Sequence, residues 1–98
     1  MAEVLTAEAV RDELGGLAGW SQDPAGITRT VELASFPEAI GLVDRVAATA
    51  EELDHHPDID IRWRTVTFRC VTHSAGGVTR RDIELARRID EIVGGTTR

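Results

Sequence analysis

The spacing of apolar residues predicts a helix near each end of the chain, and each helix precedes a glycine pair. The first is expected over residues 6–15, with a threonine cap at its start and Gly15-Gly16 as its stop. The last should begin at Thr79, with Asp82 at its third helical position, and end at Gly94-Gly95. Its apolar face is expected to consist of Ile83, Ala86, Ile89, Ile92 and Val93.

A middle helix is predicted from Ser35 to about Asp54. Serine followed three residues later by Glu38 is a capping box, which marks a helix start. Pro57 cannot continue a helix and disfavours α geometry in the residue before it, so the helix should end just ahead of it. The stripe expected to face the core is Phe36, Ile40, Val43, Ala47 and Ala50.

Alternating residues between the helices predict strands. A short strand begins at Trp20 and is broken by the turn residues 23–26, after which residues 27–33 alternate, so the two runs form a hairpin. Segment 58–71 is rich in β-branched residues, and its apolar parity changes near Arg64. A bulge, bend or turn must lie there, and either one bent strand or two strands would satisfy the pattern. This order of elements predicts an α+β fold with helices packed on one face of an antiparallel sheet.

Length and charge narrow the function classes. A chain of 98 residues fits a single domain over 1–98, and so small a core favours a homo-oligomer. The net charge of −6 argues against direct nucleic acid binding, which needs a basic surplus. The doublets Arg80-Arg81 and Arg87-Arg88 are interpreted as a solvated helix face.

The remaining composition predicts a soluble, cytoplasmic protein. Cys70 is the single cysteine, so no internal disulfide forms, and its apolar surroundings indicate a core residue rather than a nucleophile. The N-terminus lacks the basic and apolar regions of a signal peptide. No apolar run is long enough to span a membrane.

The chemistry is expected at the histidines. The chain has three, and all lie at predicted element ends: His55 and His56 after the middle helix, and His73 after the last strand. Imidazole exchanges protons near neutral pH, so two histidines on opposite sides of a substrate can serve as acid and base. Alternatively, the His-His-Pro run caps its helix, since imidazolium favours the C-terminal end of the dipole.

Two carboxylates are candidates to support these histidines. Glu51 lies four residues before His55 and either fixes a histidine tautomer or forms a surface pair. Asp82 either reaches the site or only caps its helix. No metal site is predicted, because adjacent histidines point in different directions and nothing completes a tetrahedral ligand set.

These residues closely resemble the pterin-4a-carbinolamine dehydratase family. The shared motif is a glutamate, three residues, His-His-Pro, an aromatic residue, a later histidine and an aspartate. Here it is filled by Glu51, His55, His56, Pro57, Trp63, His73 and Asp82. Milder likeness extends the match over about residues 14–90.

The resemblance implies a fold and a reaction. The family fold is a four-stranded antiparallel sheet with three helices on one side. Members dehydrate 4a-hydroxytetrahydropterin to quinonoid dihydropterin without a metal or organic cofactor, and form dimers or tetramers. By position, His55 and His73 would be the general acid and base, and His56 would orient the pterin. Glu51, Pro57 and Asp82 would support the pocket.

The resemblance leaves a second hypothesis open, and it is not exact at every position. Some family members act as dimerisation or assembly partners of other proteins, so a non-catalytic binding module is the alternative. The chain also departs from the commonest pattern after the histidines, with Ile59 where many members have an aromatic residue and Ser74-Ala75 where many have an acid. These positions carry no proton, so the departures concern the pocket rim and substrate preference.

Overall fold

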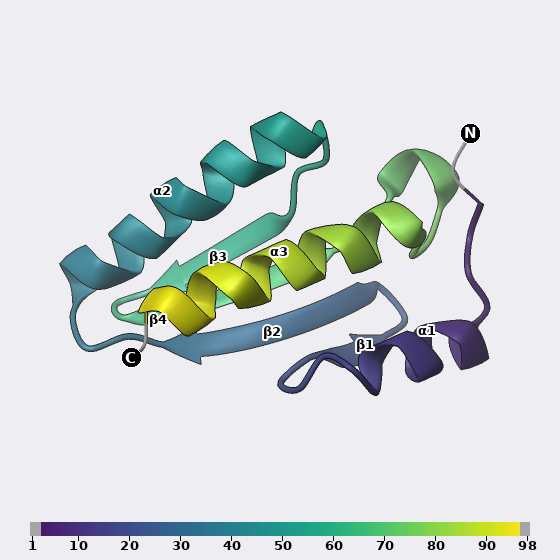
Figure 1. Ribbon diagram of the computed structural model, residues 1–98, viewed down its shortest axis with the longest axis horizontal. Helices are drawn as coiled ribbons and strands as arrows, with labels where there is room; N and C mark the ends of the chain where they lie inside the picture. Colours follow the sequence, from purple (N-terminus) through teal and green to yellow (C-terminus); the bar gives the residue numbers. More distant parts are fainter. Residues whose placement is uncertain (1–2, 97–98) are drawn as a thin grey trace.

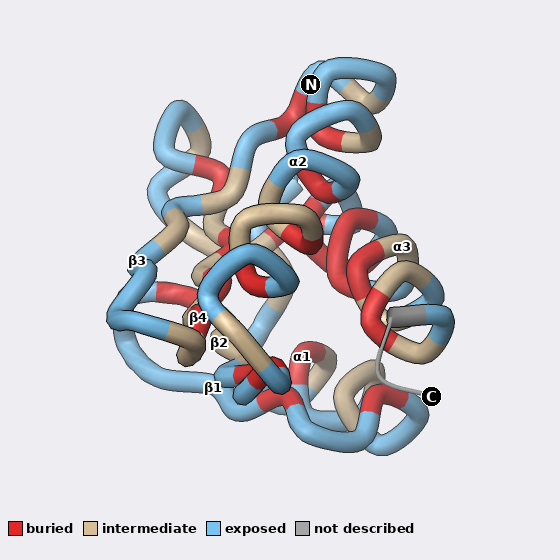
Figure 2. The backbone as a smooth tube through the Cα atoms, turned by 90° about the vertical axis from the view of Figure 1, so that its left-hand side faces the viewer, coloured by how far each residue is buried: buried red, intermediate tan, exposed pale blue. Residues whose placement is uncertain are grey.

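An antiparallel sheet with the strand order β1-β2-β4-β3 forms one layer of the protein (Figure 1). The computed structural model describes residues 3–96. Its strands are β1 (Ser21–Asp23), β2 (Gly26–Glu32), β3 (Asp58–Arg62) and β4 (Thr65–Cys70). Its helices are α1 (Ala7–Leu14), α2 (Phe36–Leu53) and α3 (Arg80–Thr96), with a short 3-10 turn η1 (His73–Ala75). The three α-helices lie on the same side of the sheet (Figure 2), so the predicted α+β architecture is confirmed.

The segment 58–71 forms two strands rather than one bent strand. Arg62 pairs with Thr65, so only Trp63 and Arg64 remain for the turn. Trp63 adopts a φ of 55°, which lets the chain reverse within two residues. This tight turn is the physical cause of the parity change near Arg64.

The first hairpin depends on a glycine. Gly26 has a φ of 147°, and a Cβ built there would lie 2.6 Å from the carbonyl oxygen of Cys70 on β4. A side chain therefore cannot be placed at this position without displacing backbone. The turn before it is held by Asp23, whose carboxylate accepts the N–H of Ala25 at 2.8 Å.

All three predicted helix starts are confirmed by their caps. The Thr6 hydroxyl accepts the N–H of Ala9 at 3.0 Å, and the Ser35 hydroxyl accepts that of Glu38 at 3.2 Å. At α3, the Asp82 carboxylate accepts the N–H of Thr79 at 2.8 Å. These bonds satisfy N–H groups that have no partner within the helix.

The predicted core stripe of α2 is wrong except at Ala50, which is buried. Phe36 and Ala47 are exposed, and Ile40 and Val43 are only partly buried. The residues that face the sheet and α3 are Ala39, Leu42, Val46 and Ala50. Both stripes are apolar at helical spacing, and packing on α3 and the core cluster selects between them.

The predicted end of α3 at Gly94-Gly95 is also wrong, because the helix continues to Thr96. Neither glycine has the positive φ of a helix-ending cap. Val93 is buried and Ile92 packs against the core cluster, so tertiary contacts hold this turn in the helix.

A polar clamp ties the β1–β2 hairpin to α3. Asp90 on α3 accepts the indole N–H of Trp20 at 2.7 Å and pairs with Arg29 of β2 at 2.5 Å. Ile27, Phe68 and Ile89 are fully buried in the core cluster between the sheet and α3. Among the described residues, no helix is both long enough and apolar enough to cross a membrane.

Candidate active site

The three histidines meet at one end of the β3–β4 hairpin. They line a cavity of about 260 Å³. The other lining residues are Asp54, Val71, Thr72, Ser74 and Arg81. The predicted clustering of His55, His56 and His73 is therefore present in the structure.

The hairpin explains how residues far apart in sequence converge. His56 precedes β3 by two positions, and His73 follows β4 by three. Because the two strands pair antiparallel from Asp58↔Arg69 to Arg62↔Thr65, the chain returns beside its starting point. The sequence predicted the element ends but not this pairing.

His55 is the buried member of the three, with 8% of its surface exposed. It follows the left-handed residue Asp54, which ends α2, and its N–H donates to the Ala50 carbonyl oxygen at 3.0 Å. Its ring Nε2 lies 2.5 Å from Oδ1 of Asp82, a side chain with no solvent exposure. Asp82 thus caps α3 and also reaches the site, so both readings of this residue hold.

Glu51 contacts His56 rather than His55. The Glu51 Oε2 lies 2.5 Å from Nε2 of His56, and both side chains are largely exposed. The expected four-residue spacing to His55 does not apply, because α2 ends at Leu53 and Asp54 turns the chain away from the helix. Glu51 can orient the imidazole of His56, which lines the cavity.

His73 lies on the exposed side of the cavity. It begins the 3-10 turn η1, and its Nε2 is 3.6 Å from Oδ2 of Asp58 at the start of β3. The site therefore offers one imidazole fixed in the interior and two at the surface. Pro57 leads from His56 into β3 and is not among the residues that line the cavity.

The sequence did not predict that Arg81 and Thr72 line this cavity. Arg81 is exposed, as the predicted solvated face requires, and it also lines both this cavity and a second one to which His55 contributes. Its guanidinium donates to the Asp54 carbonyl oxygen, which fixes the turn that carries His55. The signal available was its position in the first turn of the helix that Asp82 caps. The other three arginines of the doublets pair with acids: Arg80 and Arg87 with Glu13, and Arg88 with Glu52.

A scan against protein-family models matches residues 3–92 to the pterin 4 alpha carbinolamine dehydratase model. The chain belongs to this family. A protein of Nocardia farcinica named for the same dehydratase family is 59% identical over 90 residues, covering 92% of this chain and 95% of the relative. A crystal structure of a transcriptional coactivator/pterin dehydratase from Brucella melitensis superposes with a TM-score of 0.87 at 35% identity. That match covers 92% of this chain and 98% of the other.

A second solved structure is less similar in sequence and supports only the likeness of fold. It is a pterin dehydratase-like protein identified as a RuBisCO assembly factor in the alpha-carboxysome, with a TM-score of 0.62 and 21% identity. The match covers 76% of this chain and 87% of that protein.

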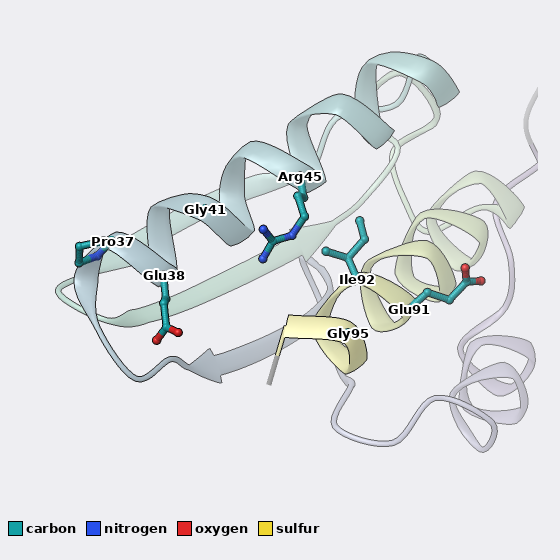
Figure 3. Close-up of a pocket in the computed structure, with 7 residues that line it drawn as sticks. All are labelled: Pro37, Glu38, Gly41, Arg45, Glu91, Ile92 and Gly95. Atoms are coloured by element: carbon teal, nitrogen blue, oxygen red, sulfur yellow. The ribbon is translucent and has the colours of Figure 1, made fainter. Parts of the chain in front are cut away.

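Two further observations concern metal ions and a second cavity in this family member. Among the described residues, no three His, Cys, Asp or Glu side chains come together as ligands for a metal ion. A larger cavity of about 740 Å³ lies between the N-terminal half of α2 and the C-terminal end of α3, where Arg45 points toward α3 (Figure 3). Its lining contains no histidine, so it is separate from the cluster described above.

Cys70 is a core residue, as predicted. Its side chain is fully buried at the end of β4. Burial raises the pKa of the Cys70 thiol far above its ordinary value of 9.0, and the negative charges of Asp82 and Asp58 raise it further. The thiolate is the reactive form, so this thiol is inert in the folded protein.

The raised pKa predicts a loss of stability at alkaline pH. Above about pH 9 the unfolded chain releases the thiol proton while the folded chain retains it, so the free energy of unfolding falls as pH rises. The slope should approach about 1.4 kcal/mol per pH unit between about pH 9 and 11. The chain contains no tyrosine and no lysine, so no other side chain titrates in this range.

Urea denaturation at several pH values measures this slope. The matched control is Cys70→Ala, which should be nearly flat over the same range. A control with the same slope as the parent protein would contradict the assignment to Cys70.

Proposed function

We propose that this protein is a dehydratase that converts 4a-hydroxytetrahydropterin into quinonoid dihydropterin and water. The observation that carries the proposal is a single cavity lined by three histidines, one of them fixed by a buried carboxylate, in a chain of the pterin dehydratase family. Its volume of about 260 Å³ lies just below the range of roughly 300–1,000 Å³ for small-molecule sites. A two-ring substrate suits such a cavity.

The reaction needs one proton donor and one proton acceptor. The C4a–O bond breaks and its electron pair leaves with the hydroxyl, which departs as water after it receives a proton. The N5–H proton is released, and its bonding electrons form the new N5=C4a double bond, so atoms and charge balance. We assign these proton transfers to His55 and His73, while His56, oriented by Glu51, binds the pterin. The role in the cell would be recycling of a tetrahydropterin in the cytoplasm.

Turnover of freshly generated 4a-hydroxytetrahydropterin, followed by ultraviolet absorbance, tests the proposal. Decay with the full-length protein should be faster than the spontaneous decay in the same buffer. The control is an equal concentration of the same protein kept unfolded in urea, compared with the spontaneous decay in that urea buffer. No acceleration by folded protein that binds the pterin product would contradict the proposed function.

A homodimer or homotetramer is also part of the proposal. Phe36 on α2, Ile61 on β3 and Trp63 on the β3–β4 turn are exposed, with 71% of Trp63 open to solvent. Exposed large apolar side chains on neighbouring elements are typical of surfaces that bind protein. Light scattering across a concentration series would give the assembly state.

The same exposed residues support a second candidate, a non-catalytic protein-binding module. The Brucella melitensis relative is named a transcriptional coactivator as well as a pterin dehydratase. A stable hetero-complex that forms equally well with His55→Ala and His73→Ala would favour this function. Turnover abolished by either change would favour the enzyme.

A further inference from the structure

Three polar side chains, Thr72, Thr79 and Asp82, are buried together behind His55. Thr72 is 3% exposed, and Thr79 and Asp82 are not exposed at all. Burying polar groups is costly unless each finds hydrogen-bond partners. Capping of α3 needs only Thr79 and Asp82, so it does not account for Thr72.

Thr72 donates its hydroxyl hydrogen to Asp82. Its Oγ1 lies 2.7 Å from Oδ2 of Asp82, and the same oxygen accepts the N–H of Thr79 at 2.8 Å. The other carboxylate oxygen, Oδ1, faces Nε2 of His55 at 2.5 Å. Both oxygens of Asp82 are therefore engaged, and the plane of the carboxylate is fixed.

The direction of every bond in this group follows from counting hydrogens. A threonine hydroxyl has one hydrogen, and that of Thr72 is already used on Asp82. The 2.7 Å contact between Thr72 and Thr79 must then use the hydrogen of Thr79. The N–H of Arg81 donates to the Thr79 oxygen at 3.2 Å, so the chain runs one way, from the start of α3 to Asp82.

The Asp82 oxygen that faces Nε2 determines the tautomer of His55. An ionised carboxylate only accepts hydrogen bonds, so the hydrogen between Asp82 and His55 belongs to Nε2. A neutral imidazole carries a single ring hydrogen, which leaves the lone pair on Nδ1.

We propose that Thr72 is a positioning residue that, with Thr79, orients Asp82 so that His55 keeps its hydrogen on Nε2 and uses Nδ1 to exchange a proton with bound substrate. The catalytic part rests on the proposed function, whereas the tautomer does not. Thr72 lines the cavity, and its Oγ1 lies 3.5 Å from Nε2 of His55 as well as 2.7 Å from Oδ2 of Asp82. The positioning role proposed for Thr72 uses its bond to Asp82.

The tautomer can be measured without any activity. Protein labelled with ¹⁵N-histidine is studied by NMR at about pH 8, where an ordinary histidine is neutral. Wild-type His55 should show a protonated-type shift at Nε2 and a lone-pair-type shift at Nδ1. A hydrogen on Nδ1 in the wild type would overturn the proposal even if no variant folded.

Two substitutions at Thr72 separate its hydroxyl from its bulk. Thr72→Val keeps the shape and removes the donor to Oδ2, so the Asp82 carboxylate can rotate away from Nε2 and His55 should become a mixture of tautomers. Thr72→Ser restores the donor and the wild-type shifts. The matched control is Thr30→Val, which breaks a 2.9 Å threonine pair with Thr67 on the sheet. Unchanged His55 shifts in Thr72→Val would overturn the proposal, since a residue that only fills space would leave the tautomer alone.

Kinetics test the catalytic part. In Thr72→Val, kcat should fall on the order of 10-fold while KM stays within about twofold, and Thr72→Ser should recover both values. Full kcat in Thr72→Val despite a changed tautomer would overturn the role of Nδ1. A wild-type protein without turnover would remove the proposed function, and the NMR spectra would still decide the tautomer.

Discussion

His55→Ala is expected to lower kcat for the dehydration by about 100-fold to 10,000-fold. His55 is the one imidazole of the cavity that a buried carboxylate holds in place. His56 and His73 are exposed and lie beside Glu51 and Asp58 instead, so neither is placed to substitute for it. His73→Ala should cost a comparable factor, because acid and base are both required in one turnover.

Matched variants separate chemistry from folding. His55→Gln keeps an N–H group for Asp82 but cannot exchange a proton, so it should lose activity as fully as His55→Ala with less loss of stability. His56→Ala should raise KM more than it lowers kcat, since its proposed role is binding. Rates come from the absorbance assay and folding from circular dichroism. A kcat within about twofold of wild type for His55→Ala or His73→Ala would contradict the acid–base assignment.

Asp82→Ala is expected to lower the free energy of unfolding by about 3–5 kcal/mol. The change removes the acceptor for Thr72, Thr79 and His55 at a fully buried position. Each donor left without a partner costs about 1–3 kcal/mol, and a small domain has only about 5–15 kcal/mol in total. The variant should therefore lose a large share of its stability.

Urea denaturation gives the magnitude, and two controls give the cause. Asp82→Asn keeps the shape and an acceptor oxygen, so its loss should be smaller than that of alanine. Asp60→Ala removes an exposed aspartate that pairs with Arg62, and it should change stability by less than about 0.5 kcal/mol. If Asp82→Ala cost less than about 1 kcal/mol, the buried network would not be a stabilising element.

Local signals in the sequence predicted the helix starts and the position of the turn between β3 and β4. A capping box acts within four residues, so Ser35 with Glu38, and Thr79 with Asp82, mark helix starts without reference to the rest of the chain. The parity change near Arg64 is local for the same reason, because alternation reports directly which face each residue occupies.

Signals that depend on packing were misread. α2 carries two apolar stripes at helical spacing, and only packing on α3 and the core cluster decides which stripe is buried. Gly94 and Gly95 resemble a helix stop, but glycine costs a helix only about 1 kcal/mol, and packing of the last turn on the core outweighs it.

The sequence by itself determined the chemical inventory of this protein: three histidines at element ends, a glutamate and an aspartate in reach, and the family to which they belong. Only the tertiary structure decided how these groups are paired. The β3–β4 hairpin brings His73 close to His55 and His56. The left-handed turn at Asp54 places His56 beside Glu51. The start of α3 places Asp82 beside His55. The type of a residue determines what its side chain can donate or accept. Hydrogen bonds between distant segments exist only once the backbone has placed both partners within about 3 Å.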